Sequence, residues 1–170
     1  MSDDDSRILF NSGISQWAWL SNFSPHPIGP FPTAEHLYQA MKTTVPEERE
    51  MIRKASSPKQ AKALSYKITK RPDWSEGFKI DVMLEITRRK FSRPALAMLL
   101  VQTGDKLLVH YAPWGDTYWG VDKEGKGRNW QGRILMMMRS ELLNGLPREE
   151  QSAGAQAVEE ALRAYSPPGP

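Results

Sequence analysis

The sequence of 170 residues contains no cysteine. This absence excludes a disulfide scaffold, a thiolate zinc site, an iron–sulfur cluster and a cysteine nucleophile. The three histidines, His26, His36 and His110, lack the spacing of a metal-binding motif, so we expect no metal site. We expect no other cofactor either, because neither a Walker A motif nor a Rossmann fingerprint is present.

Long apolar runs are also missing. No stretch of about 18 apolar residues occurs, so no transmembrane helix is expected. The first five residues, Met1–Asp5, are polar and acidic, whereas a signal peptide needs a basic start and an apolar run. The sequence therefore predicts a cytoplasmic protein with no membrane partner.

Charge is distributed unevenly along the chain, although the net charge is only +3. Residues 1–34 carry three Asp and one Arg (−2), and residues 146–170 carry four Glu and two Arg (−2), which leaves +7 for residues 35–145. A basic region of this kind suits an anionic ligand such as a nucleotide, a sugar phosphate or a nucleic acid. A solvated surface rich in Lys and Arg would give the same balance, so charge alone leaves both readings open.

Helix signals outnumber strand signals. Strands are expected at Ile8–Phe10 and Lys106–His110, with a further extended segment at Trp17–Phe23. Helices are expected to begin near residues whose types favour a helix start or N-cap: Thr33, Pro46, Ser57, Ser75, Pro94 and Asn129. The pattern predicts an α+β fold: a mainly helical single domain with a small β-sheet, over residues 1–147. Residues 148–170 are expected to form a partly flexible tail with a small helix.

Three segments carry residues suited to chemistry. Glu35, Gln39 and Lys42 share one face of a predicted helix, where they form either a substrate site or a solvent-exposed face with a weak ion pair. Tyr111–Gly120 crowds aromatic residues and an aspartate after a predicted strand, as a stacking surface or as a turn that covers the core. Gly125–Asn129 precedes a helix and offers an anion site, although a lone glycine loop is a weak signal.

Several short segments, taken in order, resemble the NADAR/YbiA-like family over about residues 8–145. They are Trp19–Phe23 (WLSNF), Pro32–Lys42 (PTAEHLYQAMK), Ala55–Pro58 (ASSP), Ala61–Lys62, Arg71–Trp74 (RPDW), Lys90–Phe91, Leu107–Val109, Asp116–Gly120 (DTYWG), Gly125–Asn129 (GKGRN) and Gly132–Met136 (GRILM). The sequence departs from the family pattern at Ser65–Tyr66, where Gly-Arg is expected after Ala61–Leu64.

The resemblance implies a YbiA-like fold and cleavage of N-glycosidic bonds. It makes Glu35, Trp74 and Asp116 catalytic candidates and Lys42 a covalent partner for the sugar C1′. The substrate is then either a ribosylated intermediate of riboflavin biosynthesis or an ADP-ribosylated guanine in nucleic acid. We favour ADP-ribosylated nucleic acid over a ribosylated nucleotide-like small molecule. A non-catalytic ADP-ribose-binding module and a plain nucleic-acid-binding protein remain alternatives from other functional classes.

The residues also suggest how such a substrate would be held. A carboxylate stabilises the positive charge that develops on the sugar as the bond breaks. An indole ring would stack on the departing base, and the glycine loop with its arginine would take phosphate. The substrate-binding candidates are Asn22, Phe23, Gln39, Tyr118, Trp119, Gly127, Arg128 and Asn129.

Overall fold

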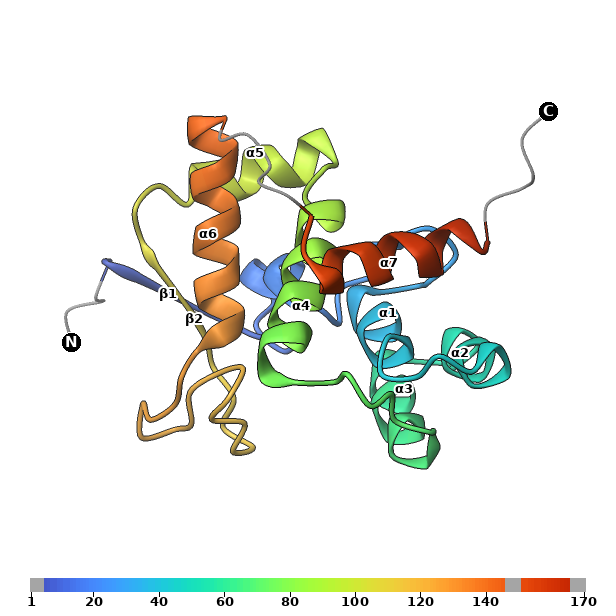
Figure 1. Cartoon of the computed structure of the whole chain (residues 1–170). Helices are drawn as coiled ribbons and strands as arrows, with labels where there is room; N and C mark the ends of the chain where they lie inside the picture. Colours follow the sequence, from blue (N-terminus) through green and yellow to red (C-terminus); the bar gives the residue numbers. More distant parts are fainter. Residues whose placement is uncertain (1–4, 146–150, 166–170) are drawn as a thin grey trace. The chain divides into compact units, whose positions relative to one another are not determined.

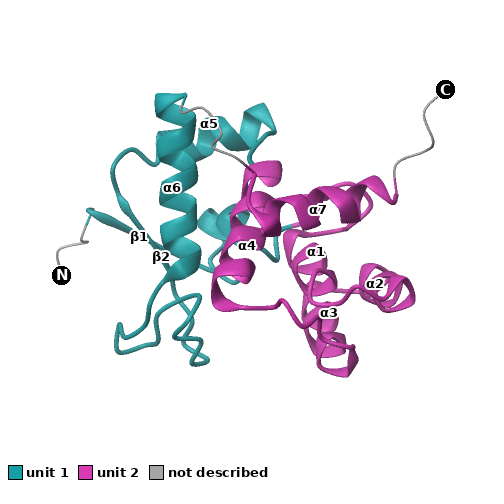
Figure 2. Cartoon of the chain, viewed as in Figure 1, with its two compact units in different colours: residues 1–24, 91–147 teal, residues 25–90, 148–170 magenta. Residues whose placement is uncertain are grey.

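The computed structural model describes residues 5–145 and 151–165. Figure 1 shows a helix-rich chain with one small sheet of two parallel strands. This arrangement confirms the predicted α+β class. The chain divides into two compact units, residues 1–24 with 91–147 and residues 25–90 with 148–170 (Figure 2). In the described parts of the chain, no helix has both the length and the apolar character needed to cross a membrane.

Unit 1 is built on the parallel strands β1 (Arg7–Phe10) and β2 (Leu107–His110), which pair Ile8 with Leu108 and Phe10 with His110. The buried sides of both strands contribute to a core that α6 (Trp130–Asn144) completes through Ile134 and Leu135. Helix α5 (Pro94–Gln102) packs against α6. Burial alternates along β1, with Ile8 and Phe10 buried and Arg7 and Leu9 exposed, so this strand is covered on one face.

The predicted extended segment at Trp17–Phe23 is wrong. Ser15–Leu20 forms a 3₁₀ helix, η1, in which Trp17 N–H donates to the carbonyl of Ile14. The turn starts at Asn11, whose side chain accepts from Gly13 N–H and donates to the carbonyl of Tyr111. Two of these hydrogen bonds are local, and the third ties Asn11 to a residue 100 positions later in the chain. Together they favour a tight helix over an extended chain, and the β-propensity of the aromatic residues does not outweigh them.

Unit 2 contains the short helices α1 (Ala34–Ala40), α2 (Pro46–Arg53) and α3 (Pro58–Leu64), followed by the 3₁₀ turn η2 (Ser65–Lys67). The long helix α4 (Glu76–Lys90) packs against both α1 and α7 (Ala153–Arg163). Gly154 permits the close approach of α7, because a Cβ atom there would lie 2.8 Å from the carbonyl oxygen of Phe78.

Helix α7 occupies the segment for which the sequence predicted a tail helix, and it buries Ala155, Val158 and Ala161. Near its end the ring of Tyr165 meets Phe31 edge-on at a centroid distance of 5.5 Å. The predicted domain boundary at residues 147–148 and the predicted loose end at 166–170 lie outside the described residues.

Candidate functional site

Helix α1 carries polar residues into the interior of unit 2. Its start is set by Thr33, whose hydroxyl accepts from His36 N–H and lies 2.8 Å from His36 Nδ1. His36 Nε2 lies 3.0 Å from the carbonyl oxygen of Ala55, which ties the helix to the segment before α3. All seven residues of α1 are buried, including Glu35 and Gln39. The face is therefore not the solvent-exposed alternative considered from the sequence.

Glu35 and Gln39 form a buried hydrogen-bonded pair. Gln39 Nε2 donates to Glu35 Oε1 at 2.6 Å, as expected for polar residues one helical turn apart. Gln39 is only 2% exposed, and within the described residues its Oε1 atom accepts no hydrogen bond. A buried acceptor without a donor costs free energy, so this oxygen is suited to a ligand hydroxyl or amine.

Lys42 follows α1, and its ammonium lies 5.3 Å from the centroid of the Tyr38 ring. Partial burial lowers the pKa of Lys42 to about 8, with further lowering by the charges of Lys70 and Lys62 and opposition from Glu35. At that pKa, about a tenth of the Lys42 side chains are neutral amines at pH 7. Lys42 is therefore equipped to act as a nucleophile near neutral pH, which an ordinary lysine is not.

Trp74 contacts α1 through a cluster of aromatic rings. Its ring lies 5.6 Å from Tyr38 and 5.8 Å from Phe78, measured between centroids. The backbone of this segment is held to the chain just after the end of α1, because the N–H of Arg71 donates to the carbonyl of Lys42 at 2.8 Å. The structure thus gathers Glu35, Gln39, Lys42 and Trp74 within unit 2.

Sequence reasoning missed several members of this group. Tyr38 precedes Lys42 by four positions, and that helical spacing was the available signal for the ring beneath the ammonium. Lys62, Lys70 and Lys79 surround Lys42 closely enough for their charges to lower its pKa. For Lys62 and Lys70 the signal was a run of basic residues without acids from 53 to 71, but no local pattern showed that the run folds toward α1, and Lys79 lies outside that run.

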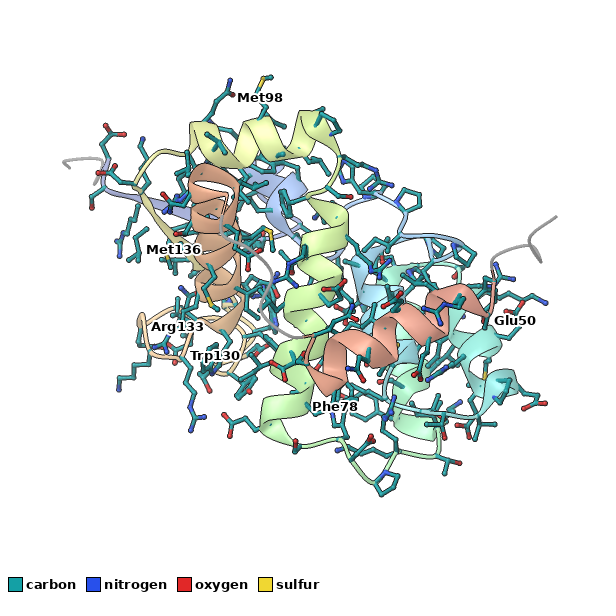
Figure 3. The ribbon with its side chains drawn as sticks, turned by 45° about the horizontal axis from the view of Figure 1, so that its top comes forward. Glu50, Phe78, Met98, Trp130, Arg133 and Met136 are labelled. Carbon is teal, nitrogen blue, oxygen red and sulfur yellow. The ribbon has the colours of Figure 1, made fainter. Side chains whose placement is uncertain are left out.

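The remaining candidates lie in unit 1. Asp116 Oδ1 accepts from the backbone N–H groups of Tyr118 (3.1 Å) and Trp119 (2.9 Å), which closes a tight turn. The rings of those two residues meet edge-on at 5.0 Å. The guanidinium of Arg128 lies 5.8 Å from the Tyr118 centroid. Near the start of α6, Figure 3 shows Arg133 beside Trp130, whose ring its guanidinium approaches to 5.1 Å.

Asn129 holds α6 against β2. The residue lies at φ 54°, and its side chain accepts from His110 N–H and donates to the carbonyl of Leu108, both at 2.9 Å. Asn129 is the N-cap residue of α6, as expected, but its side chain makes no capping hydrogen bond because these two strand groups use both ends of the amide. The geometry gives Asn129 a structural role whether or not it also contacts a substrate.

Close backbone approaches shape the glycine loop. A Cβ atom at Gly127 would lie 2.1 Å from the carbonyl oxygen of Gly120, at a φ of 152° that favours glycine. The loop also contacts the Asp116 turn, since Arg128 N–H donates to the carbonyl of Thr117.

Asn22 lies against the first turn of α6, where its amide exchanges two hydrogen bonds with Gln131. Phe23 N–H donates to the Ser21 hydroxyl.

Comparison with known families gives a match to the NADAR domain over residues 9–143. The chain belongs to the NADAR domain family. Every candidate residue, from Asn22 to Asn129, lies inside the matched region. The resemblance identified from short motifs is thereby confirmed at the level of the family.

Individual relatives of this NADAR protein fall into two groups by name. The chain is 37% identical over 145 residues to "N-glycosidase YbiA" of Escherichia coli (strain K12), covering 81% of this chain and 89% of that protein. It is 38% identical over 150 residues to "Riboflavin biosynthesis protein PYRR, chloroplastic" of Zea mays, covering 75% of this chain but only 24% of that protein. The NMR structure of E. coli YbiA superposes with a TM-score of 0.73 at 35% identity, covering 86% of this chain and 90% of that one.

Proposed function

We propose that this NADAR protein is an N-glycosidase that cleaves the bond between an ADP-ribose and a guanine base in nucleic acid. The observation that carries the proposal is the buried Glu35–Gln39 pair beside Lys42, an amine whose pKa is lowered to about 8. A buried carboxylate and a partly neutral amine seven residues apart in one short segment are chemical equipment that a merely structural helix does not need. The relatives named N-glycosidase support this reaction class.

Cleavage of an N-glycosidic bond needs stabilisation of a cationic sugar. As the bond between C1′ and the base nitrogen breaks, its electron pair leaves with the base and positive charge spreads over C1′ and the ring oxygen. The Glu35 carboxylate stabilises that charge or activates water. Gln39 Oε1 accepts a hydrogen bond from a ribose hydroxyl, while Trp74 stacks on the base.

Two routes complete the reaction. In the first, water attacks C1′, gives one proton to the departing base and leaves the hydroxyl on the sugar. In the second, neutral Lys42 bonds to C1′ as the base leaves with the proton that the amine loses. The resulting glycosylamine opens to a Schiff base: the bond between C1′ and the ring oxygen breaks, the nitrogen forms a double bond to C1′, and the proton of the nitrogen passes to the ring oxygen. Water then hydrolyses the imine and restores the amine.

Two candidate substrates fit this reaction class. The basic balance of residues 35–145 favours a phosphate-rich ligand, and a nucleic acid presents more phosphates than a free ribosyl nucleotide. A second candidate, a ribosylated intermediate of riboflavin biosynthesis, is favoured by the name of the maize relative. On this alternative the protein clears or processes a small metabolite.

A paired assay separates these candidates. Wild-type protein is incubated with an oligonucleotide bearing ADP-ribosylated guanine and, separately, with a ribosylamino-pyrimidine phosphate. Release of ADP-ribose from the oligonucleotide alone is expected, and cleavage of the pyrimidine alone would overturn the proposed substrate. Glu35→Gln should lose activity, whereas Glu47→Gln, which changes an exposed carboxylate on α2, should keep it. Retention of ADP-ribose without turnover of either substrate would indicate a binding module.

Borohydride reduction separates the two routes. A Schiff base between Lys42 and the sugar is reduced to a stable adduct that mass spectrometry locates on the peptide containing residue 42. The adduct should disappear in Lys42→Ala. Absence of any adduct during active turnover would leave direct attack by water as the route.

A further inference from the structure

The segment from Arg53 to Arg71 contains seven basic residues and no acidic one. It comprises the end of α2, all of α3 and the η2 turn, and it continues to Arg71, whose N–H donates to the carbonyl of Lys42 just after α1. The seven residues are Arg53, Lys54, Lys59, Lys62, Lys67, Lys70 and Arg71. A cationic segment of this length suits an anionic partner, and its ion pairs and exposure decide whether it is free to bind one.

Three of these seven cations form ion pairs with two acids near the segment. Arg53 and Lys54 both pair with Glu50, and Arg71 pairs with Asp73. A third acid beside the segment, Glu48, has a lowered pKa because it accepts from the hydroxyl of Thr43 and from the N–H and hydroxyl of Thr69.

The other four cations, which we call the lysine strip, are Lys59, Lys62, Lys67 and Lys70. Among the residues that the structure describes, none of the four forms an ion pair. Lys59, Lys67 and Lys70 are exposed, and Lys62 is half-buried. The strip is therefore available to phosphate groups that arrive from solvent.

An exposed aromatic ring lies within the strip. Tyr66, on η2, is 82% exposed, more than any other large hydrophobic side chain among the described residues. A ring of this size left in water has little structural reason, since burial of its apolar surface would stabilise the fold. An exposed ring flanked by lysines is the combination with which proteins bind single-stranded nucleic acid, because the base stacks on the ring and the lysines meet the backbone.

We propose that the lysine strip and Tyr66 bind a single strand of nucleic acid, with one base stacked on Tyr66 and neighbouring phosphates on Lys59, Lys67 and Lys70. Two members of the strip, Lys62 and Lys70, lie close to Lys42, so a strand on this surface passes beside the candidate catalytic group. The inference rests on the proposed function, since the bound strand is the one that carries the ribosylated base. It assigns the choice of a polymeric substrate to residues outside the catalytic group.

The test measures binding without catalysis. Fluorescence anisotropy with an unmodified, labelled single-stranded oligonucleotide gives the dissociation constant and its dependence on salt. Tyr66→Ala should weaken binding about 5- to 150-fold, the range for loss of one stacked base, and Tyr66→Phe should retain it. Lys59→Ala/Lys67→Ala should reduce the slope of log K against log salt by about 1.4, or roughly 0.7 for each phosphate contact.

A charge-matched control uses Lys123→Ala/Arg163→Ala, which removes two exposed cations from elsewhere on the chain and should leave the slope unchanged. Three results would overturn the proposal: no binding by the wild type at low salt, equal binding by the strip variants, or equally tight, strip-dependent binding to polyglutamate or to vesicles containing phosphatidylserine. The last result would indicate a general anion surface.

The same variants distinguish failure of this inference from failure of the proposed function. If the strip binds the unmodified strand but no glycosidic bond is cleaved, the surface stands and the proposed function fails. If ADP-ribosylated oligonucleotide is cleaved with the same kcat/KM by wild type and by Lys59→Ala/Lys67→Ala, the function stands and the strip proposal fails. Support for both requires kcat/KM to fall on the oligonucleotide and to stay unchanged on ADP-ribosylated guanosine.

Discussion

The pH dependence of the reaction follows from the environment of Lys42. Its pKa of about 8, against an ordinary value of 10.5, raises the fraction of neutral amine at pH 7 from roughly three in ten thousand to about one in eleven. If the amine attacks C1′, kcat/KM should rise about tenfold per pH unit below pH 8 and level off above it. If the ammonium acts by its charge, activity should instead fall above pH 8.

Removal of a neighbouring charge tests the cause of this pKa. Lys70→Ala removes a positive charge that lowers the pKa of Lys42, so the midpoint of the pH profile should move upward. Glu35→Gln removes a negative charge that raises this pKa, so the midpoint should move downward in whatever activity remains. Lys123→Ala, a change of the same charge in unit 1, should leave the midpoint unchanged.

The pKa of Lys42 can also be measured without a substrate. Competitive acetylation followed by mass spectrometry reports the neutral fraction of Lys42 at each pH, and the reactivity should reach half its maximum near pH 8. Lys123, an exposed lysine of unit 1, serves as the internal reference. Half-maximal reactivity of Lys42 near pH 10, together with a flat rate profile through pH 8, would refute the reasoning about both burial and charge.

Three further predictions concern stability, measured by urea unfolding. Lys42→Met should stabilise the protein by up to about 3 kcal/mol at pH 7, because the folded chain holds this proton less tightly than the unfolded chain, and the gain should shrink between pH 8 and pH 10.5. Gly132→Ala should cost more than about 2 kcal/mol, because its Cβ would lie 2.1 Å from a β2 carbonyl oxygen, whereas Gly77→Ala meets no atom within 4 Å and should be neutral or slightly stabilising. Thr33→Ala should cost about 1 to 2 kcal/mol, because it removes the cap of α1 and a partner of the His36 ring, and Thr33→Ser should retain most of that stability.

Much of the fold could be predicted from local signals. The starts of α1 and α3 follow from Thr33 and Ser57, whose side chains accept hydrogen bonds from backbone N–H groups of the first turn. The end of α6 follows from Gly145, which adopts the left-handed conformation. The 3₁₀ turn at Ser15–Leu20 could not be predicted in the same way, since it depends on hydrogen bonds made around Asn11.

The candidate site was less accessible from sequence. Helical spacing placed Glu35, Gln39 and Lys42 on one face, but spacing does not reveal burial, and polar residues on a short helix ordinarily face solvent. For Asn129 the local signal gave the position but not the role of the side chain. Its position before a helix predicts a cap, yet contacts with a strand about 20 residues earlier in the chain determine what its side chain does.

Helix α1 is the point at which folding and chemistry make opposite demands. A seven-residue helix that is buried throughout would be most stable with apolar side chains, because each buried polar group needs a partner to offset its lost hydration. His36 meets that condition through Thr33 and Ala55, and it serves the fold. Gln39 leaves an oxygen without a donor among the described residues, and Lys42 holds its proton weakly. Because neither feature stabilises the folded chain, a ligand that supplies the missing hydrogen bond and uses the amine is the economical explanation for both.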